Sequence, residues 1–201
     1  MIGIDEVGRG CWAGPLLVVA ARQKTRLPEG LNDSKILTQK NRERLAPLIE
    51  ASCDIGEGWV TAVEIDNFGL SKAMRLGVER ALIAIKPVFN EEVIIDGDID
   101  YITAVAGESR AISRLKLLSR SQIKGDRDNP VISAASIHAK VRRDNLMREL
   151  SLQYPAYGFE DHVGYGTKKH IDALNKLGVS DLHRLSYKPV KAVYDAAQST
   201  Y

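Results

Sequence analysis

Cysteines, aromatic residues and long hydrophobic runs are all scarce in this sequence of 201 residues. The two cysteines, Cys11 and Cys53, are too few for a disulfide framework and are not spaced as metal ligands. The longest apolar run, residues 15–21, is much shorter than a membrane span. No basic segment precedes the first apolar residues, so we expect no secretory signal and a place in the reducing cytoplasm.

The sequence also has no large excess of charges of one sign, because 28 Lys and Arg residues nearly balance 26 Asp and Glu residues. The net charge is +2. The two signs are nevertheless separated along the chain. Residues 50–108 contain 12 acidic and 4 basic residues, whereas residues 110–148 contain 10 basic and 3 acidic ones. This separation is typical of an enzyme that binds a polyanion beside a metal site, and equally of two solvated faces of opposite sign.

Apolar runs and helical periodicity alternate along the chain, which predicts an α/β fold with a mixed sheet flanked by helices. The run at residues 15–23 is continuous enough for a strand inside a sheet. Strands are predicted at residues 1–5, 15–23, 53–63 and 92–98. Helices are predicted from Thr38 as N-cap to about Ala51, over 72–86 with Ser71 as N-cap, over 131–150, and over 167–178 with Gly178 as C-cap.

Four acidic residues lie where apolar segments meet glycine turns. They are Asp5 and Glu6 before Gly8, Asp96 before Gly97, and Asp126 after Gly125. Ligands of α/β folds usually bind at strand ends, and carboxylates gathered there would repel one another unless divalent cations held them. Two such ions could support phosphodiester cleavage. The alternative is that Asp and Gly simply favour turns, and composition does not decide between the two.

The segment GRGCWA at residues 8–13 formally matches a dinucleotide-binding fingerprint. That fingerprint needs a helix directly after it, whereas Pro15 and the apolar run that follows predict a strand, and Glu29, at the required spacing, lies in a loop. Dinucleotide binding is therefore disfavoured. A Gly-Arg-Gly turn instead lets backbone groups approach a sugar hydroxyl, and Arg9 can pair with a phosphate.

Seven ordered blocks along nearly the whole chain resemble the type 2 ribonucleases H, the ribonuclease HII of bacteria. The blocks are GIDEVGRGCWAGP (3–15), LNDSKILTQKNRERL (31–45), IIDG (94–97), IKGD (123–126), ISAASIHAKVRRDNLM (132–147), YPAYGFEDHVGYGTKKHIDAL (154–174) and HRLSYKP (183–189). The resemblance implies one catalytic domain over residues 1–201, with a ribonuclease-H-like core and a helical C-terminal part from about residue 150. Few residues follow the last block, so we expect no long C-terminal extension.

By this resemblance the protein is expected to hydrolyse the RNA strand of RNA–DNA hybrids. It is also expected to incise on the 5′ side of single ribonucleotides in duplex DNA, leaving a 3′-hydroxyl and a 5′-phosphate. The implied cofactor is a divalent cation, Mn²⁺ or Mg²⁺, with two ions per active site during catalysis. The expected partners are these nucleic acids and no membrane. We expect a monomer, and a replication or repair partner is not readable from the sequence.

The resemblance also implies roles for individual residues. Asp5, Glu6, Asp96 and Asp126 correspond to the catalytic, metal-binding carboxylates of the family. Substrate-binding roles fall to Gly8, Arg9 and Gly10, a turn that reads the 2′-hydroxyl, to Tyr165, which stacks on the neighbouring deoxyribose, and to Lys35, which contacts a phosphate. One departure is Val163, where the family usually has Lys.

Most affinity is expected from phosphate contacts, made by Arg9, Lys35 and the basic stretch at residues 110–148. The four histidines are expected to be packing or surface residues, because His162, His170 and His183 share no metal-ligand spacing and His138 lies in a small-residue helix.

Two other functions remain open at this point. A resolvase or integrase type of nuclease would share the carboxylates, but not the Gly8-Arg9-Gly10 turn together with Tyr165. A non-catalytic hybrid-binding module would have lost a carboxylate, whereas all four positions are acidic here.

Overall fold

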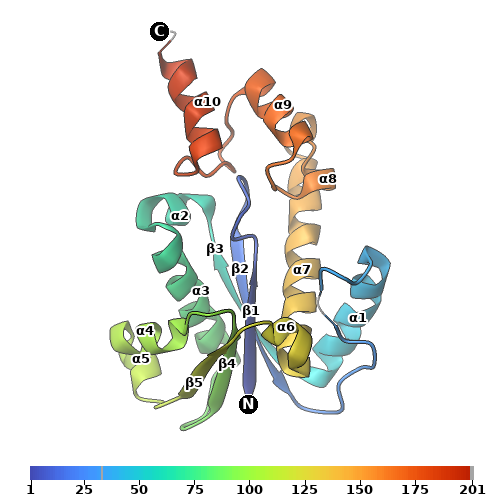
Figure 1. Cartoon of the computed structure of the whole chain (residues 1–201), viewed down its shortest axis with the longest axis vertical. Helices are drawn as coiled ribbons and strands as arrows, with labels where there is room; N and C mark the ends of the chain where they lie inside the picture. Colours follow the sequence, from blue (N-terminus) through green and yellow to red (C-terminus); the bar gives the residue numbers. More distant parts are fainter. Residues whose placement is uncertain (33, 200–201) are drawn as a thin grey trace. The chain divides into compact units, whose positions relative to one another are not determined.

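The computed structural model describes residues 1–32 and 34–199, and Figure 1 shows their helices and strands. These residues form two compact units, each assembled from segments that are distant in the sequence. The first unit contains residues 1–7, 17–59 and 74–141, and the second contains residues 8–16, 60–73 and the chain from residue 142 onward. That the whole chain acts as one catalytic domain stays a prediction.

The first unit is built on a mixed sheet (Figure 1). Its five strands lie in the order β3 (Cys53–Val60), β2 (Leu16–Gln23), β1 (Ile2–Val7), β4 (Glu92–Asp96) and β5 (Leu118–Gln122). Strand β1 pairs antiparallel with β2 and parallel with β4, and β4 pairs parallel with β5. The predicted α/β class is confirmed, and β2 lies inside the sheet as its apolar run predicted.

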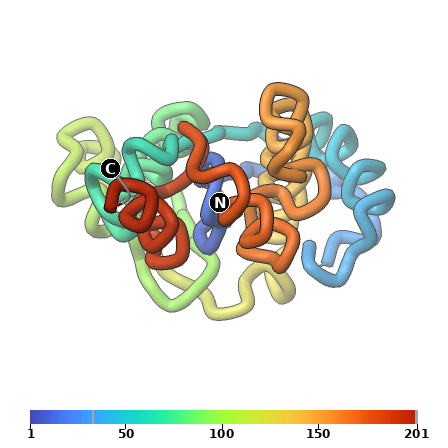
Figure 2. The backbone as a smooth tube through the Cα atoms, turned by 90° about the horizontal axis from the view of Figure 1, so that it is seen from above, coloured from blue at the N-terminus to red at the C-terminus, as the bar shows by residue number. Residues whose placement is uncertain are grey.

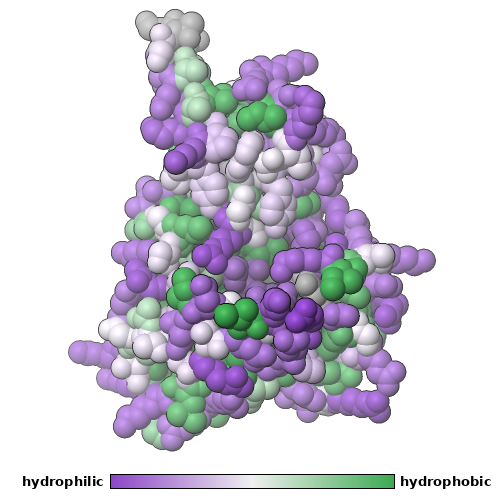
Figure 3. Space-filling view, in the orientation of Figure 1, coloured by the Kyte–Doolittle hydropathy of each residue, from purple (hydrophilic) through white to green (hydrophobic). Residues whose placement is uncertain are grey.

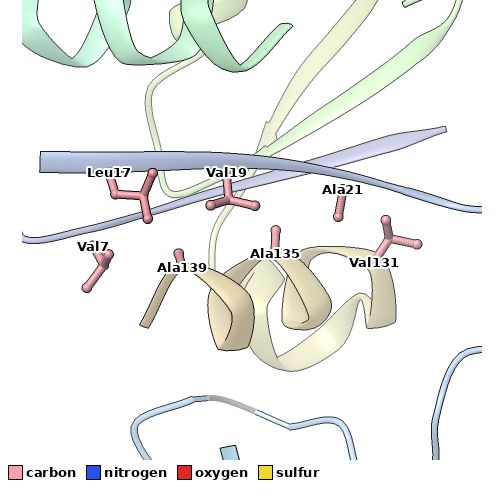
Figure 4. Packing of buried hydrophobic residues seen from close by; sticks show 7 residues of the cluster. All are labelled: Val7, Leu17, Val19, Ala21, Val131, Ala135 and Ala139. Atoms are coloured by element: carbon pink, nitrogen blue, oxygen red, sulfur yellow. The ribbon is translucent and has the colours of Figure 1, made fainter. Parts of the chain in front are cut away.

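Successive side chains of strand β2 point to opposite faces of the sheet, and a helix covers each face. On one face, Val18 lies against Gly77 of helix α3 (Leu70–Ile85), where an added Cβ would come within 2.5 Å of the valine. The other face meets helix α7 (Pro130–Ser151) in a buried cluster, seen in Figure 4, of Val7, Leu17, Val19, Ala21, Val131, Ala135 and Ala139. The small alanines let this helix approach the sheet closely.

The start of α7 also lies close to β1. A Cβ at Gly3 would come within 2.7 Å of the backbone nitrogen of Ile132, so only glycine fits there without a shift. Helix α1 (Gln39–Ser52) begins after its predicted N-cap, Thr38. Figures 1 and 2 show α1 beside α7, and the two share a buried cluster of Leu45, Ile49, Cys53, Ala134 and Ile137.

Two predicted strands end earlier than expected. Strand β3 stops at Val60 instead of residue 63, because Thr61 forms a capping box with Glu64 and begins helix α2 (Ala62–Phe68). The strand predicted at residues 92–98 stops at Asp96, since Gly97 turns the chain with φ 100°.

Helix α3 starts at Leu70, so Ser71 lies in its first turn and the prediction of Ser71 as N-cap is wrong. Strand β5 was not predicted, because its sequence LSRSQ is polar and it lies at the edge of the sheet. The sequence patterns also did not reveal the short helices of this unit, α4 (Tyr101–Glu108), α5 (Arg110–Ser113) and α6 (Gly125–Asp128).

The second unit is mainly helical, as expected for the chain beyond about residue 150. It includes α2, the last turns of α7, η1 (Pro155–Tyr157), α8 (Phe159–His162), α9 (Lys168–Leu177) and α10 (Lys188–Gln198). Its buried cluster consists of Ala13, Met147, Tyr157, Phe159 and Val163.

The surface is mixed in character. On the face drawn in Figure 3, hydrophobic side chains occupy small separate areas among hydrophilic ones. None of the described helices is long and apolar enough to cross a membrane.

Candidate active site

Three aspartates meet at the ends of neighbouring strands of the first unit. Strands β1 and β4 pair Ile4 with Ile95, so the next residues, Asp5 and Asp96, follow the same register. Asp126 arrives from α6, and its N–H and that of Gly125 donate to Asp96 Oδ1 at 3.3 and 2.7 Å. One carboxylate oxygen from each of the three aspartates lies within 4.8 Å of the other two. Residues far apart in the sequence thus form one acidic group.

Burial makes this group electrostatically unfavourable without a counter-charge. The residues Asp5 and Asp126 are 6% and 4% exposed. Burial, followed by the negative charge of Glu6, raises the pKa of Asp5 well above its usual value, and Asp96 adds to the rise. Three oxygen donors at this separation match the hard ligands that Mg²⁺ and Mn²⁺ prefer. A divalent cation therefore fits the residues present.

Glu6 is not one of the three residues of this acidic group. Within the described part of the chain, the candidate metal group contains the three aspartates and not Glu6. Both Asp5 and Glu6 are still inside β1, where successive side chains alternate between faces. The Glu6 N–H donates to Asp5 Oδ1 at 2.7 Å, and its charge acts on the Asp5 carboxyl. A metal-binding role for Glu6 stays a prediction.

The segment containing Lys35 reaches the acidic group at two points. Lys35 Nζ lies 3.2 Å from Asp126 Oδ2, while the lysine side chain remains 77% exposed. Ser34 shares a hydrogen bond of 2.8 Å with Ser136 of α7, and Ser136 in turn hydrogen-bonds Asp5. Sequence reasoning missed both serines, although the small polar residues of the α7 face were visible. Asp33, in the same sequence block, lies outside the described residues.

The candidate substrate-binding residues other than Lys35 belong to the second unit. Gly8, Arg9 and Gly10 form a turn in which Gly8 has φ 89° and its carbonyl accepts from Cys11 N–H at 3.3 Å. A Cβ at Gly8 would come within 2.3 Å of the Arg143 side chain. Arg9 and Gly10 are exposed, and no atom lies within 4 Å of where a Gly10 Cβ would be. The turn thus presents backbone to solvent.

Tyr165 is anchored through its backbone and leaves part of its ring exposed. Its N–H donates to the His162 carbonyl and its carbonyl accepts from Thr167 N–H, both at 2.8 Å. The ring centroid lies 6.0 Å from the Arg143 guanidinium carbon, and the residue is 37% exposed. Burial, followed by the neighbouring Cys11, raises the pKa of Tyr165 to about 12, so its hydroxyl stays protonated. A neutral, partly exposed ring suits stacking on a sugar.

Two fully buried arginines hold the loop that follows the turn. Arg143 donates to the carbonyls of Pro15, Ala13 and Val163 at 2.8 to 3.1 Å, and Arg184 donates to the Gly14 carbonyl through two nitrogens. Both residues are 0% exposed. Sequence reasoning counted Arg143 in the basic stretch expected to contact phosphate. Its burial excludes that role, and the residue organises the loop instead.

Three histidines that sequence reasoning treated separately are brought together in the second unit. His162 and His170 stack with ring centroids 4.4 Å apart, and Nε2 of His170 lies 3.1 Å from Nε2 of His183. Among the described residues, the aspartates form the group of three or more ligand side chains that could hold a metal, and the three histidines are buried in the second unit.

The hydrogen bonds define which ring nitrogens carry protons. His170 Nδ1 faces the Tyr165 carbonyl and must donate, so its Nε2 accepts from His183. His183 Nδ1 accepts from the Ser180 N–H at 2.9 Å, which leaves its proton on Nε2. All these bonds are made at once only when both rings are neutral, and burial lowers the pKa of His170 and of His183 to about 4.

A mixed sheet with clustered aspartates at its strand ends defines the class of ribonuclease-H-like nucleases. The family model of ribonuclease HII matches residues 2–190. Ribonuclease HII of Campylobacter concisus is 44% identical over 186 residues, which cover 92% of this chain and 91% of the relative. The chain therefore belongs to the ribonuclease HII family, and it is a ribonuclease H, a hydrolase that cleaves nucleic acid internally.

Solved structures share the fold. Ribonuclease HII of Archaeoglobus fulgidus, in a complex with PCNA, has a TM-score of 0.78 and 25% identity, with 96% of this chain and 95% of that chain covered. Bst-RNase HIII in complex with Mn²⁺ has a TM-score of 0.70 and 22% identity, with 98% of this chain and 70% of that chain covered. The predicted ribonuclease-H-like core is confirmed.

Proposed function

We propose that this protein hydrolyses the RNA strand of RNA–DNA hybrids and incises on the 5′ side of single ribonucleotides in duplex DNA, leaving a 3′-hydroxyl and a 5′-phosphate. The observation that carries the proposal is the convergence of Asp5, Asp96 and Asp126 to within 4.8 Å in a chain of the ribonuclease HII family. Acids at this spacing serve phosphodiester hydrolysis when they hold divalent cations.

The three aspartates would hold the cofactor, with Glu6 completing the set of four carboxylates. Bound Mg²⁺ or Mn²⁺, two ions during catalysis, supplies positive charge against the phosphate and lowers the pKa of water at the site. Support for this cofactor comes from the oxygen donors present, from the raised pKa of Asp5, and from the Mn²⁺ complex of Bst-RNase HIII.

Lys35 and Ser136 would keep the carboxylates in place. Lys35 neutralises part of the charge on Asp126 while its exposed ammonium remains available to a substrate phosphate. Ser136 hydrogen-bonds Asp5, and such a bond to the charged form of a carboxyl lowers its pKa, which favours the ionised state that a cation requires.

Selection of RNA over DNA would depend on the Gly8-Arg9-Gly10 turn and on Tyr165. The 2′-hydroxyl is the group that separates the two nucleic acids at a given site, and an exposed glycine backbone can donate to it and accept from it. The Tyr165 ring would stack on the deoxyribose of the next nucleotide. Arg9 and Lys35 would contribute phosphate contacts, which supply most of the affinity.

We further propose that the enzyme acts as a monomer in the cytoplasm. The Archaeoglobus fulgidus relative was solved in a complex with PCNA, so a replication clamp is the class of partner we propose for this chain.

The test uses four radiolabelled substrates, namely a duplex with one ribonucleotide, a long RNA–DNA hybrid, an all-DNA duplex and an all-DNA branched junction, each with Mg²⁺ and with Mn²⁺. We expect cuts in the first two, a 5′-phosphate on the downstream product, and no cut without a divalent cation. Cleavage of an all-DNA branched junction in their place would support the resolvase type. Binding to a hybrid without metal-dependent cleavage would support a non-catalytic module.

A further inference from the structure

The carbonyl of Arg9, in the middle of the Gly8-Arg9-Gly10 turn, accepts hydrogen bonds from two donors of the second unit. The Tyr187 hydroxyl donates to it, and Nη1 of Arg184 lies 3.2 Å from it. Both donors come from the block HRLSYKP, 175 residues or more away in the sequence. The turn is thus tied to a distant segment through one backbone oxygen.

The direction of this carbonyl also determines the direction of the next N–H. A trans peptide is planar, so the Gly10 N–H points opposite to the Arg9 C=O. Because the carbonyl points at Tyr187 and Arg184, the Gly10 N–H points away from them. The two hydrogen bonds therefore set which way the exposed peptide of the turn presents its donor.

Arg184 also binds the loop that follows the turn, through the carbonyl of Gly14. Its Nε and Nη2 donate to the Gly14 carbonyl at 3.0 and 2.8 Å, while its Nη1 also donates to the Tyr187 hydroxyl at 3.0 Å. The guanidinium lies 5.3 Å from the Tyr187 ring and is fully buried. The buried guanidinium holds its acceptors rigidly, because each of its N–H groups left without a hydrogen-bond acceptor would cost free energy.

Tyr187 itself is held by helix α2. The Asp66 carboxylate accepts from the N–H of Leu185 at 2.8 Å and of Ser186 at 2.9 Å, and from the Ser186 hydroxyl at 2.6 Å. These three bonds fix the residues directly before Tyr187. A continuous set of contacts therefore runs from Asp66 through the 185–187 loop to the Arg9 carbonyl.

A groove of about 670 Å³ opens beside the same turn, and its walls are Arg9, Gly10, Gly69, Leu70, Ser186 and Tyr187. The side of the turn next to Tyr187 therefore has room for a flexible peptide to rotate. Without the two donors, the Arg9–Gly10 peptide would sample several orientations, because the glycines on either side of Arg9 restrict it little.

We propose that Tyr187 and Arg184 are positioning residues for ribose recognition, which orient the Arg9–Gly10 peptide so that the turn can discriminate a 2′-hydroxyl. The inference rests on the proposed role of the Gly8-Arg9-Gly10 turn. Neither residue needs to touch the substrate for this role. Loss of the Tyr187 hydroxyl should therefore reduce selection of RNA over DNA, with little effect on general affinity for nucleic acid.

The experiment compares the full-length protein with Tyr187→Phe, which removes the hydroxyl and keeps the ring beside Arg184. The matched control is Tyr194→Phe, a tyrosine of α10 in the same unit. Fluorescence anisotropy measures the Kd for a duplex with one ribonucleotide and for the same duplex in DNA alone. Cleavage kinetics on the first duplex and the melting temperature of each variant are measured in parallel.

We expect Tyr187→Phe to raise the Kd for the duplex with one ribonucleotide about fivefold, the factor typical of one hydrogen bond. The Kd for the all-DNA duplex should be unchanged, so the ratio of the all-DNA Kd to the ribonucleotide Kd should fall about fivefold. The kcat/KM of Tyr187→Phe should fall by a similar factor, and Tyr194→Phe should match the wild type. Arg184→Lys, which keeps the charge but not the fork, should lose selectivity as well. If Arg184→Lys unfolds, the Tyr187→Phe result alone decides.

The outcomes separate this inference from the proposed function. A wild-type protein that binds both duplexes equally overturns the proposed reading of the 2′-hydroxyl. A selective wild type with a Tyr187→Phe variant of unchanged selectivity overturns the positioning role alone. A variant that loses affinity for both duplexes to the same extent also overturns it, because that result indicates a general contact.

Discussion

Nε2 of His170 and Nε2 of His183 lie 3.1 Å apart in the interior of the second unit, with a single proton between them. Since the Nδ1–H of His170 donates to the Tyr165 carbonyl, this arrangement exists only while both rings are neutral. The histidines therefore connect the protonation state of a buried cluster to the backbone of a candidate substrate-binding residue.

The first prediction concerns acid stability. Burial lowers the pKa of His170 and of His183 to about 4, from 6.5 in the unfolded chain. Between these values the unfolded chain binds more protons than the folded one. The contribution of these two histidines to the free energy of unfolding should thus be constant above pH 6.5 and should fall as the pH drops from 6.5 to 4, by about 1.4 kcal/mol per pH unit for each histidine.

Urea unfolding at pH 7, 5.5 and 4.5 measures this slope. Burial also lowers the pKa of His162, so this histidine adds to the same slope. The variant His183→Gln should have a shallower slope than the wild type. An identical slope in the variant would show that acid sensitivity originates elsewhere.

The second prediction concerns metal binding. Asp96→Asn keeps an oxygen that can accept from Gly125 N–H but removes one charge from the aspartate group. Cleavage should drop about a thousandfold or more, because several kcal/mol of transition-state stabilisation depend on the metal, while hybrid binding should persist. Mn²⁺ should raise the melting temperature of the wild type and much less that of the variant.

A control for this test is Asp98→Asn, two residues further along, which should respond to Mn²⁺ as the wild type does. Turnover of Asp96→Asn at the wild-type rate would refute the metal assignment. Asp5→Asn should behave in the same way as Asp96→Asn.

The third prediction concerns phosphate contacts. Lys35→Ala should weaken binding of hybrid and all-DNA duplex to the same degree and should reduce the slope of log Kd against log salt by about 1. The exposed Lys40, at the start of α1, provides the matched control. A salt slope that is equal in Lys35→Ala and wild type would remove Lys35 from the list of phosphate ligands.

The fourth prediction uses two glycines as a pair. Gly3→Ala would bring a methyl group within 2.7 Å of the Ile132 backbone, so it should destabilise the fold by about 1–3 kcal/mol through overpacking. Gly107, inside helix α4, has no atom within 4 Å of an added Cβ, and Gly107→Ala should stabilise by about 0.5–1 kcal/mol. Chemical denaturation of both variants measures whether the free energy of unfolding falls for Gly3→Ala and rises for Gly107→Ala. Equal changes in the two variants would contradict the close approach of α7 to β1.

Part of this molecule was predictable because its determinants are local. The continuous apolar run of β2 indicated an interior strand, and Thr38 marked the start of α1 through its own hydroxyl. Strand β5 escaped prediction because an edge strand can be polar on both faces. Helix α2 was not predicted because its capping box begins at the residue directly after strand β3, with no turn residues between them.

Residue type and order were enough to predict the family, the acidic residues at the ends of apolar segments and the glycines of the turn. The tertiary structure was needed to show which acids meet, because parallel pairing of β1 with β4 aligns Asp5 with Asp96, and the group of three aspartates does not include Glu6. The tertiary structure also shows that Arg143 and Arg184 are buried and hold backbone carbonyls, and that Tyr187 contacts Arg9. Burial, and contacts between residues more than a hundred positions apart, cannot be read from a local sequence pattern.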